Sequence, residues 1–163
     1  MPTGLLPLAA TDESATLTDP QAVAEAFLAA LAADDVERSA ELIDPDIEYV
    51  NVGLPTVRGR REFEKVLALA ARPDTGFEVY LHSISADGPV VLTERTDALI
   101  IGKLRIQFWV WGRFDVHEGK ITLWRDSFDF LDILRGTVRG LLALAVPSLQ
   151  TRPPTDLGAA PGR

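Results

Sequence analysis

The chain contains no cysteine and only two histidines, His82 and His117, among its 163 residues. The lack of cysteine excludes disulfides, thiol nucleophiles and cysteine-bound zinc, and two histidines are too few for a histidine-rich metal site. The sequence also has no glycine-rich nucleotide loop and no G-x-S-x-G motif. These absences argue against nucleotide-dependent enzymes and against serine hydrolases of the α/β-hydrolase type.

Basic side chains are scarce, with 16 lysines and arginines against 24 acidic residues and a net charge of −8. A chain this acidic is repelled by nucleic acids and by anionic membranes. No apolar run reaches the about 18 residues of a membrane span, so we expect no membrane insertion. The apolar segment near the N-terminus, 5–10, is short, follows no basic residue and contains Pro7, which argues against a secretory signal. The sequence therefore predicts a cytoplasmic protein.

The length and the balance of 47% hydrophobic and 25% charged residues are those of one soluble globular domain. Residues 1–18 are expected to form a flexible leader, and 19–146 a single domain. Residues 147–163 are rich in proline and glycine, and we expect them to form a disordered tail.

Helices are predicted in the first half of the domain. Asp19 and Pro20 have the residue types of a helix N-cap and first helical position, and an apolar stripe follows over 21–33. A second short helix is expected over 36–43, a strand over 47–52, and a third helix over 61–71.

Strands are predicted in the second half, over 77–86, 90–100, 104–117 and 121–130. Short turns between them indicate an antiparallel meander. A last amphipathic helix is expected over 131–145, with Leu134, Val138, Leu141 and Leu142 on one side. Helices followed by long strands indicate an α+β fold. Long strands covered on one side by helices should curl around a conical cavity.

Polar residues occur on three of the predicted strands, and on two of them they form i, i+2 pairs, which share one face. Tyr49 and Asn51 form one pair, and Arg95 and Asp97 form another; Asp126 stands alone between Trp124 and Phe128. A solvated outer face is the default interpretation of such charges. Aspartate is, however, disfavoured inside strands, so its recurrence calls for another explanation.

A buried cluster of Asp97, Arg95 and Asp126 would carry one excess negative charge if both acids were ionised. Uptake of one proton makes it neutral and leaves one protonated and one ionised carboxyl on a shared guanidinium. Such a pair is a general acid beside a general base.

The ordered set of motifs resembles the limonene-1,2-epoxide hydrolase family. The motifs are Tyr49-Val50-Asn51, then Glu94-Arg95-Thr96-Asp97, then Trp124-Arg125-Asp126, and the resemblance covers roughly residues 20–145. It implies a cone-shaped NTF2-like or SnoaL-like fold. In that fold, N-terminal helices pack on a strongly curved, mixed but mostly antiparallel sheet, and the C-terminal helix closes a pocket.

The resemblance also implies the role of each site residue. Asp126 would be the base that takes a proton from water, Tyr49 and Asn51 would hold that water, and Asp97 would protonate the epoxide oxygen. Arg95 would orient both acids. No metal, cofactor or covalent intermediate is needed for this single step.

The expected pocket wall is apolar, which favours a lipophilic epoxide such as a terpene, fatty-acid or sterol derivative. The segment Val52-Gly53-Leu54 differs from the limonene enzyme, so limonene oxide itself is not the assigned substrate. The wall is expected to contain Leu99, Phe108, Val110, Phe128, Leu134 and Val138.

A homodimer is also expected. Alternation along 104–114 turns Phe108 and Val110 toward the pocket and Trp109 and Trp111 away from it. Two exposed tryptophans in one patch are typical of an interface, and the resembled family dimerises through its sheet.

Two other functions remain open from the sequence. One is a SnoaL-like isomerase or polyketide cyclase that uses a buried aspartate on a ketone. The other is a non-catalytic NTF2-like module that binds a lipid or a protein.

Overall fold

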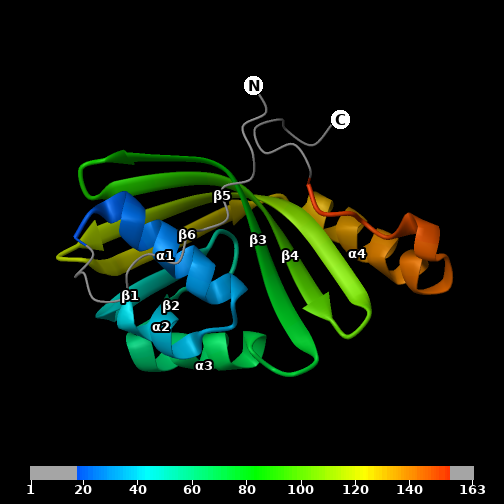
Figure 1. Cartoon of the computed structure of the whole chain (residues 1–163), viewed down its shortest axis with the longest axis horizontal. Helices are drawn as coiled ribbons and strands as arrows, with labels where there is room; N and C mark the ends of the chain where they lie inside the picture. The colour runs from blue at the N-terminus through cyan, green and yellow to red at the C-terminus, as the bar shows by residue number, and fades with distance from the viewer. Residues whose placement is uncertain (1–17, 155–163) are drawn as a thin grey trace.

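The structure is a computed structural model that describes residues 18–154. Most of the predicted leader and residues 155–163 of the predicted tail lie outside the described residues. The described part has four α-helices and six strands (Figure 1). In chain order the elements are α1 (Pro20–Ala32), α2 (Val36–Glu41), β1 (Ile43–Asn51), β2 (Val57–Arg58), α3 (Arg60–Ala70), β3 (Thr75–Asp87), β4 (Val90–Ile101), β5 (Leu104–His117), β6 (Lys120–Phe128), α4 (Phe130–Ala145) and the 3-10 helix η1 (Pro147–Leu149).

The six strands form one sheet in the order β2-β1-β6-β5-β4-β3. The β1 and β6 strands run parallel, and every other neighbouring pair is antiparallel. In Figure 1 the helices α1, α2 and α3 gather over one part of this curved sheet, and α4 lies at the other end. The predicted α+β fold with a mixed, mostly antiparallel sheet is therefore confirmed.

Local signals explain several element boundaries. Asp19 caps α1, because its side chain accepts a hydrogen bond from the N–H of Ala22, and Pro20 is the first helical residue. The turn between β5 and β6 has positive φ at both Glu118 and Gly119, as a tight hairpin turn requires. The β6 strand is shorter than expected because Asp129 leaves the sheet and caps α4.

The main core lies between the first three helices and the inner face of the sheet, the face that these helices cover. Trp124 on β6 stands at its centre, with ring centroids 5.1 Å from Phe27 on α1 and 5.9 Å from Phe63 on α3. Phe114 on β5 stacks on the same indole at 5.9 Å. This aromatic cluster fixes the indole of Trp124 in one place, two residues before Asp126.

The last helix contacts the sheet with a side that the sequence did not predict. Leu134 and Val138 are 58% and 49% exposed, because α4 approaches β5 through Gly136 and Gly140 instead. A Cβ atom on Gly136 would lie 2.7 Å from the carbonyl oxygen of Gln107, so only glycine permits this approach. Helical geometry of 3.6 residues per turn puts positions 134 and 138 on the opposite side of the helix.

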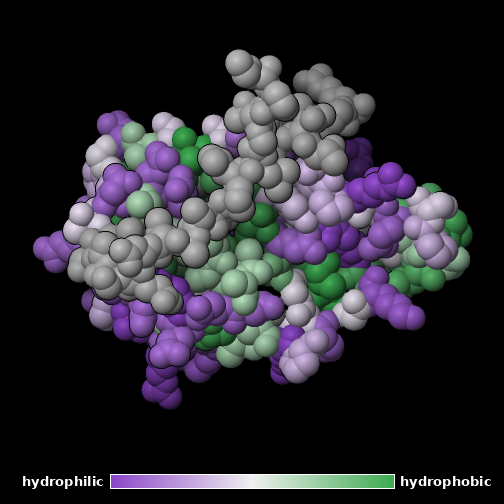
Figure 2. Space-filling view, in the orientation of Figure 1, coloured by the Kyte–Doolittle hydropathy of each residue, from purple (hydrophilic) through white to green (hydrophobic). Residues whose placement is uncertain are grey.

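The exposed apolar side of α4 gathers at one end of the molecule (Figure 2). The tail that follows α4 was expected to be disordered, but its first residues form η1, and Arg139 donates a hydrogen bond to the carbonyl of Leu149. Within residues 18–154, no helix combines the length and the apolar character that crossing a membrane requires.

Candidate active site

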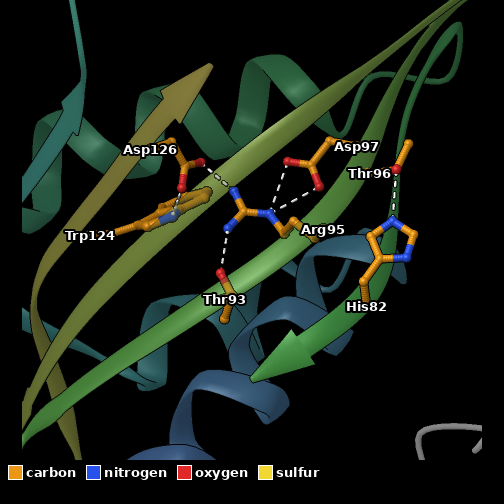
Figure 3. Close-up of polar contacts among 7 residues, drawn as sticks. All are labelled: His82, Thr93, Arg95, Thr96, Asp97, Trp124 and Asp126. Atoms are coloured by element: carbon orange, nitrogen blue, oxygen red, sulfur yellow. Dashed lines mark hydrogen bonds and ion pairs between the residues drawn. The ribbon is translucent and has the colours of Figure 1, made fainter. Parts of the chain in front are cut away.

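Polar side chains of β4 and β6, two of the three predicted polar strands, meet on the inner face around one buried arginine (Figure 3). Arg95 has no exposed surface, and Asp97 and Asp126 are 2% and 4% exposed. Nε of Arg95 donates to both carboxylate oxygens of Asp97, at 2.9 and 3.1 Å. Nη2 donates to Oδ2 of Asp126. The expected cluster of two acids on one guanidinium is present, and the alternative of a solvated outer face is wrong.

The remaining hydrogen bonds of the cluster involve two residues to which the sequence assigned no role. Nη1 of Arg95 donates to the hydroxyl of Thr93 at 3.1 Å. The indole Nε1 of Trp124 donates to Oδ1 of Asp126 at 2.8 Å. Asp126 therefore accepts hydrogen bonds from two different residues, whereas among the residues that the structure describes Arg95 is the one that donates to Asp97.

Tyr49 and Asn51 lie beside Asp126 because β1 runs parallel to β6. Asn51 is the cross-strand partner of Asp126, and Tyr49 is the partner of Trp124. The ring of Tyr49 packs on the indole of Trp124, with centroids 4.5 Å apart. All five predicted catalytic residues thus lie in one region of the inner face.

The charges in this region shift the pKa of each group. Burial raises the pKa of Asp97 to about 7; the guanidinium of Arg95 lowers it and the charge of Asp126 raises it. Burial also raises the pKa of Asp126, while Arg95 and the indole N–H of Trp124 act in the opposite direction. Arg95 stays protonated, because the two carboxylates raise its pKa against the effect of burial.

Tyr49 also remains protonated at neutral pH. Burial and the nearby charge of Asp126 raise its pKa to about 12, and a hydrogen bond with Asn51 lowers it. The phenol is therefore a donor beside a carboxylate.

A second apolar cluster adjoins the acids on the α4 side. Phe108 and Val110 belong to it together with Ile106, and Phe128 packs against it. Leu99 is the cross-strand partner of Ile106 and is 37% exposed. Leu134 and Val138, expected in the same wall, point away from this cluster as described above, and the residue of α4 that packs on it is Ile133.

The outer face of the sheet carries different polar contacts. His82 is half-buried: it shares a hydrogen bond of 2.8 Å with Thr96 and stacks on Trp109. The expected outward orientation of the tryptophans is confirmed, since Trp111 is 57% exposed. His117 is exposed at the end of β5. In the part of the chain that the structure describes, no group of three or more metal-ligating side chains comes together.

Part of this site could have been found in the sequence. Thr93 and Trp124 follow the same i, i+2 alternation as Arg95 and Asp126, so the pattern placed them on the right face. Their contacts depend on rotamers and on cross-strand register, which one sequence does not specify.

Comparisons with known proteins agree with this geometry. The family model of the limonene-1,2-epoxide hydrolase catalytic domain matches residues 18–139. Epoxide hydrolase EphG of Mycobacterium tuberculosis is 52% identical over 126 residues, which are 77% of this chain and 84% of that protein. The solved structure of a Mycobacterium tuberculosis LEH-like epoxide hydrolase superposes with a TM-score of 0.78 at 50% identity, covering 82% of this chain and 94% of that one.

More distant structures share the fold alone. An NTF2-like protein of Burkholderia xenovorans is 20% identical with a TM-score of 0.59, covering 71% of this chain and 92% of that one. The predicted NTF2-like architecture and the predicted epoxide hydrolase identity are both confirmed. With a matched family model over most of its domain and a relative at 52% identity, the chain belongs to the limonene-1,2-epoxide hydrolase family.

Proposed function

We propose that this epoxide hydrolase converts a lipophilic epoxide to a vicinal diol in one step, by acid- and base-assisted attack of water. The observation that carries the proposal is one buried guanidinium shared by two buried carboxyls, Asp97 and Asp126. A binding module has no use for two buried carboxyls, and an isomerase or cyclase that acts on a ketone does not need its acid and its base to share one guanidinium. Two acids on one cation therefore favour epoxide hydrolysis.

In this mechanism Asp126 is the base. Hydrogen bonds from Arg95 and from the indole of Trp124 stabilise its ionised form. Water next to Asp126, Tyr49 and Asn51 gives its proton to Asp126 while its oxygen forms a bond to an epoxide carbon. Because Tyr49 keeps its proton at neutral pH, its phenol can donate a hydrogen bond to this water.

Asp97 is the acid. As the epoxide C–O bond breaks, its electron pair goes to the oxygen, which takes the proton of Asp97. A pKa of about 7 keeps much of Asp97 protonated at neutral pH. A proton must pass from Asp126 back to Asp97 before the next turnover. Ring strain supplies reactivity, so positioning and proton transfer are sufficient for catalysis.

The apolar cluster beside the acids supports a lipophilic substrate. Phe108, Val110, Phe128 and Leu99 are placed to contact an apolar substituent, and such contacts contribute binding through buried apolar area. Terpene, fatty-acid and sterol epoxides share this chemistry.

A single-turnover experiment in heavy-oxygen water tests the mechanism. Direct attack of water gives labelled diol on the first turnover. Attack by an aspartate instead forms an ester, whose hydrolysis gives unlabelled first-turnover diol. With enzyme in excess over an apolar epoxide, we expect labelled diol; unlabelled diol would overturn the assignment of Asp126 as a base. Extensive treatment with a chelator should leave the rate unchanged, since the proposed step uses only side chains and water.

We further propose a homodimer that forms through the outer face of the sheet. Trp111 is exposed there, beside Trp109 with ring centroids 6.4 Å apart. We expect Trp111→Glu to convert a dimer to a monomer in sedimentation measurements, and Leu134→Glu on α4 to leave the dimer intact. A monomeric wild type at micromolar concentration, or dissociation by Leu134→Glu alone, would contradict the proposal.

The cytoplasmic location stays a prediction.

A further inference from the structure

Arg95 reaches Asp126 across an intervening strand. The β4 and β6 strands are not neighbours, because β5 lies between them. Adjacent strands are about 4.8 Å apart, so the side chain of Arg95 spans two such spacings on the inner face. The position of β5 that it crosses is Gly112, whose cross-strand partners are Thr93 on β4 and Asp126 on β6.

Gly112 leaves the space through which the guanidinium passes. A Cβ atom built on Gly112 would overlap Nη1 of Arg95 and the hydroxyl oxygen of Thr93, and would lie 3.2 Å from Oδ1 of Asp126. The neighbouring inner-face positions of β5, Val110 and Phe114, carry large side chains. A side chain at 112 would block the contact between Arg95 and the base.

Thr93 holds the third arm of the guanidinium (Figure 3). An arginine ordinarily favours two parallel hydrogen bonds to a single carboxylate. Here the three nitrogens are divided: Nε contacts Asp97, Nη2 contacts Asp126, and Nη1 contacts the Thr93 hydroxyl. Thr93 binds Nη1 on the side of the guanidinium that faces away from both acids. This hydrogen bond holds the guanidinium in the orientation in which Nε faces Asp97 and Nη2 faces Asp126.

We propose that Thr93 and Gly112 are positioning residues, which together seat the guanidinium of Arg95 so that it is shared between the acid and the base. This inference rests on the proposed function, because the sharing matters only if the two acids have different roles. Gly112 supplies the space and Thr93 supplies the hydrogen bond.

A matched pair of substitutions tests the hydrogen bond. Thr93→Val keeps the shape of the side chain and removes the acceptor, whereas Thr93→Ser keeps the acceptor. Without the hydroxyl, the buried cation interacts more strongly with its two carboxylates, which lowers the pKa of Asp97. In Thr93→Val we expect the upper limb of the kcat profile to move to lower pH by about half a unit to one unit. We expect kcat to fall about 10- to 100-fold with little change in KM. Losses of this size are typical when a hydrogen bond that orients a functional side chain, such as a metal ligand, is removed.

Thr93→Ser should restore the wild-type pH profile. Thr96→Val is the control on the same strand: it removes a threonine hydroxyl that contacts His82 on the outer face, and should leave the profile unchanged. A merely structural role would lower the melting temperature of Thr93→Val without moving the limb, and that result would overturn the proposal for Thr93.

To test whether Gly112 provides the space for the guanidinium, we compare Gly112→Ala with the control Gly76→Ala. Gly76 also lies in a strand, and a Cβ there would meet only Ile100 at 3.4 Å. We expect Gly112→Ala to lower kcat at least about 100-fold, as the loss of a positioned acid–base pair does, and Gly76→Ala to have little effect. If Gly112→Ala does not fold, it is placed in a Thr93→Ala/Arg95→Ala background, which removes both groups that the added Cβ would overlap, and we expect it to cause little further loss of stability there. A large further loss in that background, or an active Gly112→Ala, would overturn the proposal for Gly112.

A titration of the free protein separates failure of this inference from failure of the proposed function. Carboxyl ¹³C chemical shifts of Asp97 and Asp126 report their protonation without substrate. If Thr93→Val shifts the pKa of Asp97 but the wild type forms no diol, the proposed function is wrong and the positioning role of Thr93 still holds. If the wild type forms diol and Thr93→Val leaves both the titration of Asp97 and the rate unchanged, Thr93 does not position the guanidinium.

Discussion

The inner and outer faces of the sheet both carry charged side chains, but they balance charge differently. On the outer face two arginines each contact a single acid: Arg105 contacts Glu78 at 2.7 Å, and Arg113 contacts Asp115 at 2.8 Å. On the inner face one buried cation, Arg95, serves two acids. A balanced pair holds its charge state, whereas an unbalanced buried cluster favours the uptake of a proton. This difference supports our proposal that proton transfer takes place at the inner cluster.

The largest effect should come from neutralising one inner acid. We expect Asp126→Asn and Asp97→Asn each to lower kcat by at least about 10²- to 10⁴-fold, as the loss of a general base or acid does. Asp115→Asn removes an acid of the outer face and should leave kcat within about twofold of wild type, because it lies outside the proton-transfer path. Initial rates of diol formation measure all three, and near-normal turnover by Asp126→Asn would contradict the assigned roles.

The next largest effect should follow from removing the shared cation. Arg95→Gln leaves two buried acids without a cation, which should abolish most activity and lower the free energy of unfolding by about 3–5 kcal/mol at neutral pH. The loss should shrink in acid, where both carboxyls take up protons. Chemical denaturation at two pH values measures it, with Arg105→Gln on the outer face as the control. Equal losses for the two variants would show that the two faces do not differ.

A smaller effect concerns the dependence of stability on pH. The pKa of Asp97 is about 7 in the folded protein and about 3.9 in an unfolded chain. The folded state therefore binds more protons between these values, and the contribution of Asp97 to stability falls as pH rises from about 4 to 7. We expect Asp97→Asn to remove this slope in unfolding experiments. The same slope in wild type and variant would place the pKa of Asp97 near its ordinary value.

The smallest effect should come from Trp124→Phe, which deletes one N–H donor to Asp126 and keeps an aromatic ring. Loss of the donor should raise the pKa of Asp126, so the lower limb of the pH–rate profile should move to higher pH by about half a unit to one unit. Trp109→Phe on the outer face is the matched control. An unmoved limb in Trp124→Phe would mean that Asp126 does not depend on the indole for its ionised form.

The sequence predicted the fold well where local patterns decide it. Period-two alternation predicted β5 over 104–117, and the Asp19–Pro20 pair predicted the start of α1, because both depend on neighbouring residues alone. The polar residues of the inner face were also predicted, because aspartates inside strands are unusual enough to be noticed.

What the sequence did not predict depends on contacts between distant elements. The apolar side of α4 was expected to close the pocket, yet the helix packs through Gly136 and Gly140. Hydrophobic pattern indicates which side of a helix is apolar, but the close approach to β5 depends on the size of the residues at the contact. Gly112 was missed for the same reason, since its importance comes from a side chain two strands away.

The glycine side of α4 has a consequence for how copies of the chain can assemble. Before Val110, β5 pairs with β4 but not with β6, and α4 lies along the edge that β6 does not cover: Asp132 accepts a hydrogen bond from the N–H of Trp109 at 3.0 Å. An uncovered strand edge is a template for pairing with another chain. The helix α4 therefore prevents another strand from pairing with this part of β5. Two copies that meet near these strands must do so face to face, through side chains, and this leaves the backbone of the catalytic sheet intact.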